Sequence, residues 1–273
     1  MMRTDSTTPI EETIDLAHAK RLDRGSDTSF EVYEDGRYRW LQSRDGTLHS
    51  VMDRRAPERL VLPYTAAMMA GLLFVDDARS ALLLGLGGAS QARFLRRHFP
   101  AMRITAWESD AEVIGMARRH FGLDDANGCV RIVNRDVRAG VETSGQAADL
   151  ALLDLFGADG LPGWMREPDV YALCRRELAP HGVLAANLWA DADDERLGVM
   201  DGIQAAFDER TLVLCVPGYR NLVVLAFASR PLLDFAGLGD RAAALAARTG
   251  LDCPALLERL RESNYTDDQG FVL

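Results

Sequence analysis

The segment Ser80-Ala-Leu-Leu-Leu-Gly-Leu-Gly-Gly-Ala89 joins a short apolar run to three glycines, and a helical pattern follows over Gln91–His98. An apolar run, a glycine turn and a helix start, in that order, predict a buried strand that turns directly into a helix. Glycine tolerates positive φ and lets a ligand approach the backbone, and the amides of a helix start favour an electron-rich group. We therefore expect Gly85, Gly87 and Gly88 to contact a cofactor.

An acidic residue stands at the end of the next apolar run. Residues 103–107 predict a second strand, and Glu108 follows it directly, 20 residues after Gly88. This separation is close to that of the ribose-binding acid in nucleotide-binding βαβ units. The alternative is a turn without a ligand and a solvated strand end. Because the acid stands in register, the pattern favours a nucleoside-type cofactor.

Composition limits the possible functions. The 273 residues carry a formal net charge of −10, which argues against binding the phosphate backbone of nucleic acid and suits a cationic substrate. The five histidines and four cysteines show no metal-ligand spacing, so we expect no metal and a reducing compartment. No segment reaches the roughly 20 apolar residues of a membrane helix. The N-terminus has no apolar secretory core, so we expect a soluble cytoplasmic protein.

The pattern along the chain predicts four parts. Residues 1–28 are polar and are expected to form a flexible arm. Residues 29–59 alternate between apolar and polar positions around two Asp-Gly turns, which predicts a small antiparallel β meander. Residues 60–230 are expected to form the cofactor-binding catalytic domain, beginning with a mostly apolar helix over 60–74. Residues 231–273 predict a C-terminal appendage of two helices and a polar tail.

The last two predicted strands specify the type of α/β fold. Five strands are expected after residue 108: 130–133, 148–154, 183–189, 211–216 and 221–227. Only Pro217–Arg220 link the last two, so these two strands must form an antiparallel hairpin. A mostly parallel, seven-stranded, Rossmann-like sheet closed by such a hairpin is typical of class I S-adenosylmethionine-dependent methyltransferases and related transferases. A dinucleotide dehydrogenase would continue with parallel βα units instead.

Over roughly Tyr38 to Phe227, the chain resembles the spermidine/spermine synthase family, the polyamine aminopropyltransferases. Four motifs carry the resemblance in the family's order: the glycine motif at 85–90, the E-x-D cofactor motif at 107–110, the G-D motif at 134–136, and the strand-four acid with the stretch that follows it at 153–154 and 171–183. The family also has a small N-terminal β domain that helps to form dimers. The resemblance therefore implies a homodimer.

The resemblance implies a transferase of polyamine biosynthesis. Such an enzyme moves an aminopropyl group from decarboxylated S-adenosylmethionine to a small-molecule amine, and no metal takes part. Asp154 is the candidate catalytic residue that holds the amine and accepts its proton, and a capping aspartate is the alternative. The implied cofactor contacts are Gly85, Gly87, Gly88, Glu108, Ser109, Asp136, Val137 and Asp154. The candidate substrate contacts are Tyr64, Asp159, Trp189 and Asp191.

Departures from the family pattern leave other functions open. Gly88 stands where the family's glycine motif usually has an aspartate, and the usual D-S-S-D-P loop reads Asp-Leu-Phe-Gly-Ala-Asp over 154–159. Tyr64 is followed by Thr-Ala where the family usually has His-Glu. One alternative is a small-molecule methyltransferase that uses intact S-adenosylmethionine, because the absent aspartate would leave room for the methionine carboxylate. Another is a non-catalytic descendant that binds a nucleoside, or nothing, and acts through its dimer surface.

Overall fold

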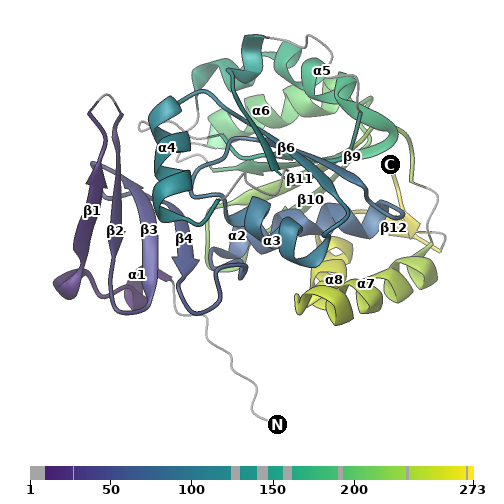
Figure 1. Ribbon diagram of the computed structural model, residues 1–273. Coiled ribbons are helices and arrows are strands. Elements are labelled where there is room, and N and C mark those ends of the chain that lie inside the picture. The colour runs from purple at the N-terminus through teal and green to yellow at the C-terminus, as the bar shows by residue number, and fades with distance from the viewer. Residues whose placement is uncertain are drawn as a thin grey trace.

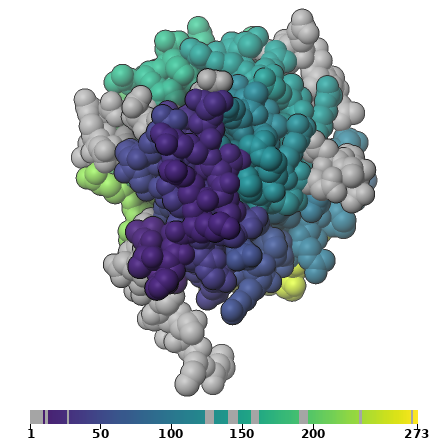
Figure 2. Space-filling view, turned by 60° about the vertical axis from the view of Figure 1, so that its left-hand side comes forward, coloured from purple at the N-terminus to yellow at the C-terminus, as the bar shows by residue number. Residues whose placement is uncertain are grey.

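Two sheets of different architecture organise the chain (Figure 1). The computed structural model describes residues 10–26, 28–123, 130–139, 147–155, 162–189, 193–231, 234–268 and 270–273, without the side chains of residues 11, 12 and 193–195. A four-stranded antiparallel sheet comes first, and a seven-stranded sheet covered by helices on both faces follows. In the space-filling view the first sheet, in purple, lies directly on the teal part of the chain (Figure 2).

The first sheet contains β1 (Lys20–Arg24), β2 (Phe30–Glu34), β3 (Tyr38–Ser43) and β4 (Leu48–Asp53), paired in chain order. Because successive strand residues point to opposite faces, Trp40 and Val51 bury one face, and Leu41 and Met52 bury the other. The Trp40 face is covered by Ile10 of α1 (Ile10–Thr13), by Ile14 after it and by Leu62, and the Leu41 face packs on helix α4 (Ala111–His120).

The first sheet begins earlier than the sequence predicted. Strand β1 lies within the stretch 1–28, which was expected to be a flexible arm, and it pairs with β2 along its whole length. Ile10 and Ile14 are also buried against this sheet. Because β1 is a half-exposed edge strand of charged residues, it lacks the apolar alternation that would have marked it.

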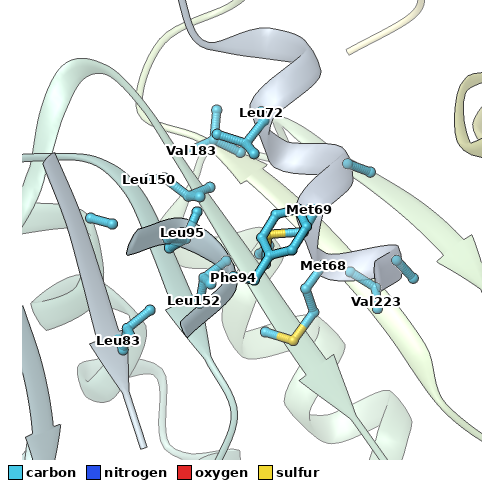
Figure 3. Close-up of a cluster of buried hydrophobic side chains, with 14 of the residues drawn as sticks. Met68, Met69, Leu72, Leu83, Phe94, Leu95, Leu150, Leu152, Val183 and Val223 are labelled. Carbon is cyan, nitrogen blue, oxygen red and sulfur yellow. The ribbon is translucent and has the colours of Figure 1, made fainter. Parts of the chain in front are cut away.

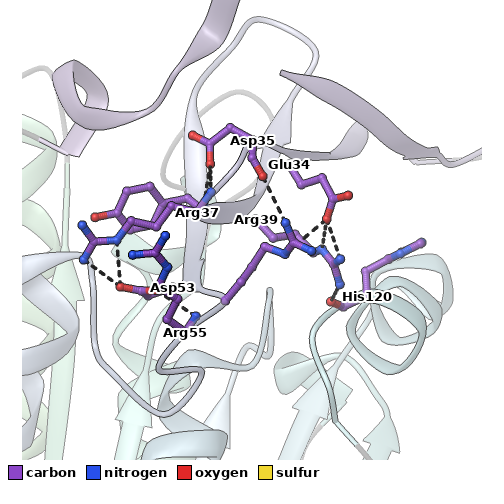
Figure 4. A network of polar contacts seen from close by, with 9 residues as sticks. Glu34, Asp35, Arg37, Arg39, Asp53, Arg55 and His120 are labelled. Atoms are coloured by element: carbon purple, nitrogen blue, oxygen red, sulfur yellow. Dashed lines mark hydrogen bonds and ion pairs between the residues drawn. The ribbon is translucent and has the colours of Figure 1, made fainter. Parts of the chain in front are cut away.

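A polar network holds the end of this sheet where β2 turns into β3 and where β4 ends (Figure 4). The guanidinium of Arg37 donates to Asp53 through Nε and Nη2, at 3.1 and 2.9 Å. Arg39 pairs with Glu34 and also donates to the backbone carbonyl of His120, at the end of α4. The arginines thus tie β3 both to its neighbouring strands and to the helix that it packs against.

The seven-stranded sheet confirms the predicted fold class. Its strands are β5 (Ser80–Leu84), β6 (Arg103–Glu108), β7 (Val130–Asn134), β8 (Ala148–Leu153), β9 (Leu178–Leu188), β10 (Thr211–Cys215) and β11 (Leu222–Phe227). They lie in the order β10-β11-β9-β8-β5-β6-β7. Strand β11 runs antiparallel to both of its neighbours, and the pairs from β9 to β7 are parallel.

Helices cover both faces of this sheet. One face carries α2 (Pro63–Met68), η2 (Met69–Phe74), α3 (Ser90–His98), α7 (Phe235–Thr249) and α8 (Cys253–Ser263). The other face carries η5 (Gly163–Arg166), α5 (Pro168–Arg176) and α6 (Asp193–Ala206). Figure 3 shows the first of these cores, in which Met68, Met69 and Leu72 pack against Phe94 and the strands. None of the described helices combines the length and the apolar character needed to cross a membrane.

Two predicted elements differ in detail. The helix expected over 60–74 begins at Pro63 and tightens into the 3-10 segment η2. Gly71 approaches the sheet there so closely that an added Cβ would lie 2.8 Å from Leu150. The strand expected over 183–189 begins earlier, at Leu178, and the pairing of β9 with β8 shifts register between Ala148 and Leu150.

The C-terminal tail, which the sequence marked only as polar, forms a short two-stranded sheet. Residues Thr266–Asp267 and Gly270–Phe271 form the short strands β12 and β13, and the Phe271 ring contacts Phe74 and Phe235. Just before them, the Asn264 side chain covers the outer edge of β10. Its Oδ1 accepts from the Val213 N–H at 2.8 Å, and its Nδ2 donates to the Val213 carbonyl at 2.7 Å.

Candidate active site

A pocket of about 240 Å³ lies where the first sheet meets the carboxyl ends of β5, β6, β7 and β8. Ligands of open α/β sheets bind at this edge of the sheet. The first sheet contributes Phe30, Leu41, His49 and Ser50 to the wall, although the sequence analysis assigned no site residue to it. Burial lowers the pKa of His49 to about 4, so its ring is neutral near pH 7.

The glycine turn after β5 forms part of the pocket wall. At Gly85 this turn lies very close to the backbone that follows β8. Gly85 has a φ of +99°, and an added Cβ would lie 2.2 Å from the carbonyl oxygen of Asp154. Gly87 also has a positive φ, of +48°. Residues with a side chain avoid positive φ values. Glycine is therefore required at both positions by the backbone conformation and by the lack of space for a Cβ.

Side chains from other segments crowd the position of Gly88. Its N–H donates to Ser50 Oγ at 2.8 Å. A Cβ added at this position would lie 2.7 Å from the Ser50 Cβ and 3.2 Å from the ring of Phe121. The place where the family's aspartate side chain would begin is therefore filled by a serine of the first sheet.

The carboxylate of Glu108 is held in place by two backbone amides. Its Oε2 accepts from the N–H of Leu86, in the glycine turn, at 3.1 Å, and its Oε1 accepts from the N–H of Asp110 at 3.0 Å. Each carboxylate oxygen has a second lone pair. Glu108 lines the pocket and can therefore accept two more hydrogen bonds, as a pair of adjacent hydroxyls would present.

Asp136 is an ionised acceptor beside an arginine that the sequence analysis did not select. The Asp136 carboxylate accepts from the backbone N–H of Arg138 at 2.8 Å and from its Nη2 at 2.6 Å. These hydrogen bonds lower the pKa of Asp136. The Arg138 guanidinium lies 5.1 Å from the ring centroid of Trp164, and both side chains line the pocket. The signal for this arginine was its place two residues after Asp136.

Asp154 follows β8 and lies partly exposed to the pocket among neutral hydrogen-bond donors. Its Oδ1 accepts from Asn187 Nδ2 at 3.0 Å, and its Oδ2 accepts from Gln91 Nε2 at 3.4 Å. The Tyr64 hydroxyl, which donates to the His49 backbone carbonyl at 3.2 Å, also lies near this carboxylate and favours its charged form. The protein keeps most water away from this carboxylate, and this burial raises the pKa of Asp154 to about 6. Burial, with the Asp154 charge, raises the pKa of the Tyr64 hydroxyl well above its usual value, so the hydroxyl stays neutral.

The structure brings most of the selected residues into one pocket. Its wall includes Tyr64, Gly85, Gly87, Glu108, Ser109, Asp136, Val137 and Asp154. Gly88 lies behind this wall, and Trp189 is half-buried after β9 outside the described lining. Asp159 and Asp191 lie outside the described residues. In the described part of the chain, no three His, Cys, Asp or Glu side chains gather as they would around a metal ion.

Curated polyamine aminopropyltransferases are similar to this chain over most of its length. The protein from Chromobacterium violaceum is 32% identical over 235 residues, which are 86% of this chain and 90% of that protein. The chain belongs to the polyamine aminopropyltransferase family. A second family member, from Neisseria meningitidis serogroup A, is 30% identical over 244 residues, or 89% of this chain and 92% of that protein. No model in a scan of protein families matches this aminopropyltransferase homologue.

Solved structures show the same fold. A probable spermidine synthase from Corynebacterium glutamicum superposes with a TM-score of 0.68 at 19% identity, covering 93% of this chain and 98% of its own. A spermidine synthase in complex with the transition-state analogue AdoDATO has a TM-score of 0.61 at 17% identity, with 77% and 74% covered. Human methyltransferase-like protein 13, in complex with SAH, has a TM-score of 0.59 at 22% identity, with 76% and 96% covered.

Proposed function

We propose that this chain transfers an aminopropyl group from decarboxylated S-adenosylmethionine to a small-molecule amine. Its family supports the reaction class. The observation that carries the proposal is the position of Asp154, a carboxylate largely withdrawn from water in the same pocket as the glycine turn and Glu108. In this pocket Asp154, as the proton acceptor, lies next to the space that would hold a nucleoside.

The pocket supports a defined placement of the sulfonium substrate. Glu108 would accept the two ribose hydroxyls, and Asp136 with Val137 would contact the adenine. The glycine turn lies between these groups and Asp154 and would leave space for the sulfonium. In the reaction the amine nitrogen attacks the carbon beside the sulfonium, the C–S bond breaks, and methylthioadenosine leaves. Alignment of the two reactants is worth about 7–11 kcal/mol of barrier, so a well-shaped pocket supplies most of the rate.

Asp154 would act on the amine. An alkylammonium has no lone pair, so it must lose a proton before or during attack, and a neighbouring carboxylate can hold the cation and take that proton. A pKa of about 6 keeps Asp154 ionised at neutral pH and makes it a stronger base than an ordinary aspartate. Among the described residues, its hydrogen-bond donors are the neutral amides of Asn187 and Gln91, so no neighbouring cation neutralises its charge and that charge can act on the substrate.

Binding and product formation test this proposal. We expect calorimetry to show tighter binding of decarboxylated than of intact S-adenosylmethionine, because Ser50 and Phe121 fill the space beside Gly88 where the methionine carboxylate was expected to fit. With a panel of amines, the protein should release methylthioadenosine. Preference for the intact form would replace the proposal with the methyltransferase alternative. Nucleoside binding without product from any amine would favour the non-catalytic one.

Replacing Glu108 by Gln should weaken nucleoside binding. The NH₂ group of the glutamine would face the backbone N–H of either Leu86 or Asp110, which is a repulsive contact. The side chain would also have one oxygen fewer to accept a ribose hydroxyl. Hydrogen bonds to charged groups are worth roughly 1.5–3 kcal/mol, so the Kd for methylthioadenosine should rise by about 10- to 100-fold. Glu258→Gln, on the exposed side of α8, is the matched control and should leave the Kd unchanged. An unchanged Kd for Glu108→Gln would contradict the assignment.

We also propose that the protein works in the cytoplasm as a homodimer. The family resemblance supports the dimer, and sedimentation of the purified protein would test it. The described cysteines Cys174, Cys215 and Cys253 are free thiols, which suits a reducing compartment.

A further inference from the structure

Two asparagines form a chain of hydrogen bonds behind Asp154. Asn187 lies near the end of β9, is 1% exposed, and donates through Nδ2 to Asp154 Oδ1 at 3.0 Å. Asn221, just before the reversed strand β11, donates through Nδ2 to Asn187 Oδ1 at 2.9 Å. Because successive strand residues point to opposite faces, the Asn187 side chain lies on the side of the first core, whose apolar side chains on β9 include Val183 and Ala185. A buried amide among apolar side chains needs hydrogen-bond partners, and those of Asn187 are Asp154 and Asn221.

The order of donors in this chain fixes the orientation of the Asn187 amide. An asparagine amide that turns by 180° exchanges its oxygen and nitrogen with little change of shape. In the turned state the Asn187 oxygen would face the Asp154 carboxylate, and its NH₂ would face the Asn221 NH₂. Both contacts would be repulsive. The Asp154 carboxylate, which can only accept, fixes the Asn187 amide with its N–H groups toward Asp154, and the N–H of Asn221 reinforces this orientation from behind.

The two oxygens of Asp154 consequently have different surroundings. Oδ1 faces Asn187, which is not part of the described pocket wall. Oδ2 lies on the side of Gln91, which does line the pocket, and their separation of 3.4 Å makes a weak hydrogen bond. We infer that Asn187, supported by Asn221, is a positioning residue that occupies Oδ1 of Asp154 and leaves Oδ2, with its weak contact to Gln91, to receive the proton of the acceptor amine. This inference rests on the proposed function.

The same hydrogen bond controls the charge of Asp154. Burial raises the pKa of Asp154, and the Asn187 hydrogen bond is the strongest of the contacts that oppose this rise. The other groups that face Asp154 are Tyr64 from α2 and Gln91 from α3, and both are neutral near pH 7. The remaining ionisable residues of the described wall are His49, Glu108, Arg135, Asp136 and Arg138. Without the Asn187 N–H, Asp154 should hold its proton to a higher pH.

The test compares Asn187→Leu and Asn221→Ala with the parent protein. For Asn187→Leu, the acidic limb of the kcat/KM profile should move upward by roughly one to two pH units, as loss of one hydrogen bond to a charge predicts. Asn221→Ala should move it in the same direction by less, because Asn187 is still present but has lost one of the two partners that orient its amide. Asn264→Ala is the matched control: its amide makes three hydrogen bonds to backbone groups, two at the β10 edge and one to Leu260 of α8, and the limb should not move.

Several outcomes would overturn this inference. The inference is wrong if Asn187→Leu or Asn221→Ala folds and the acidic limb of its kcat/KM profile stays at the parent's pH, even if the rate itself falls. Circular dichroism establishes folding, and the half-buried Asn221 position provides a variant if Asn187→Leu does not fold. If the parent releases no product from any amine, the proposed function fails by itself. The pKa of Asp154 can then be measured by carboxyl carbon NMR in ligand-free protein, where an unchanged value in both variants would still overturn the positioning role.

Discussion

Asp154→Asn should reduce aminopropyl transfer by about 10²- to 10⁴-fold, the range of a lost general base, while nucleoside binding stays within a few-fold of the parent. The substitution keeps the shape of the side chain and removes the negative charge and the proton acceptor. Single-turnover release of methylthioadenosine measures the first effect, and calorimetry with methylthioadenosine measures the second. The parent's kcat/KM should fall as the pH drops below about 6, since protonated Asp154 cannot accept a proton. That limb should be absent from the residual activity of the variant.

The same substitution should not destabilise the protein. The pKa of Asp154 is about 6 in the folded chain and near the ordinary value of about 3.9 in the unfolded one. The folded state therefore holds the proton more tightly, and ionisation of Asp154 lowers the free energy of unfolding above pH 6. We expect Asp154→Asn to melt at or above the parent's temperature at pH 8. That difference should shrink as the pH falls from 6 towards 4.

Asp149, on the same strand, provides a matched control. Its Oδ2 accepts from the N–H groups of Arg79 and Ser80, both at 2.9 Å, and it does not line the pocket. Asp149→Asn should therefore lower the melting temperature and retain activity, the opposite of Asp154→Asn. If Asp154→Asn instead melts well below the parent and retains turnover, Asp154 is a structural cap and its catalytic assignment is wrong.

Gly85→Ala should damage both stability and activity. The added Cβ would lie 2.2 Å from the Asp154 carbonyl oxygen, a backbone atom that cannot move without shifting the end of β8. A left-handed backbone alone costs a non-glycine residue about 1–2 kcal/mol, and the collision adds to that. The loss in the free energy of unfolding should therefore clearly exceed 2 kcal/mol in urea titrations. Turnover should fall as well, because the shift displaces Asp154.

Gly122 separates the two contributions. It has a φ of +65°, and an added Cβ would meet no atom within 4 Å. Gly122→Ala should therefore show the backbone cost alone, with activity retained. Equal losses for the two variants would mean that the close approach at Gly85 does not constrain the turn.

Local patterns were enough to predict the sheet and the two principal acids. The buried run before Gly85 and the four-residue link before Asn221 each determine a strand through short-range physics. Glu108 and Asp154 follow their strands directly, and parallel strands bring their carboxyl ends to one edge. Their convergence in one pocket therefore follows from the strand order.

Contacts between distant segments could not be predicted in this way. Ser50 fills the space beside Gly88 from 38 residues away, and no local pattern marks a serine in an alternating strand. Gln91 looks like an ordinary residue of a helix start. Asn187 could in principle have been selected, because a polar residue inside an apolar strand indicates a buried hydrogen-bond partner. Only the pairing of β8 with β9, however, identifies that partner as Asp154.

The Asn264 side chain has a consequence for the protein at high concentration. Strand β10 ends the seven-stranded sheet, and Val213 is its central residue. An exposed edge offers unpaired N–H and C=O groups to any other chain, which is the starting point of strand addition and aggregation. By bonding both backbone groups of Val213, one amide imitates the neighbouring strand that the sheet lacks. The Asn264 side chain thus makes the backbone groups of Val213 unavailable to a strand of another molecule, which should reduce aggregation through the β10 edge.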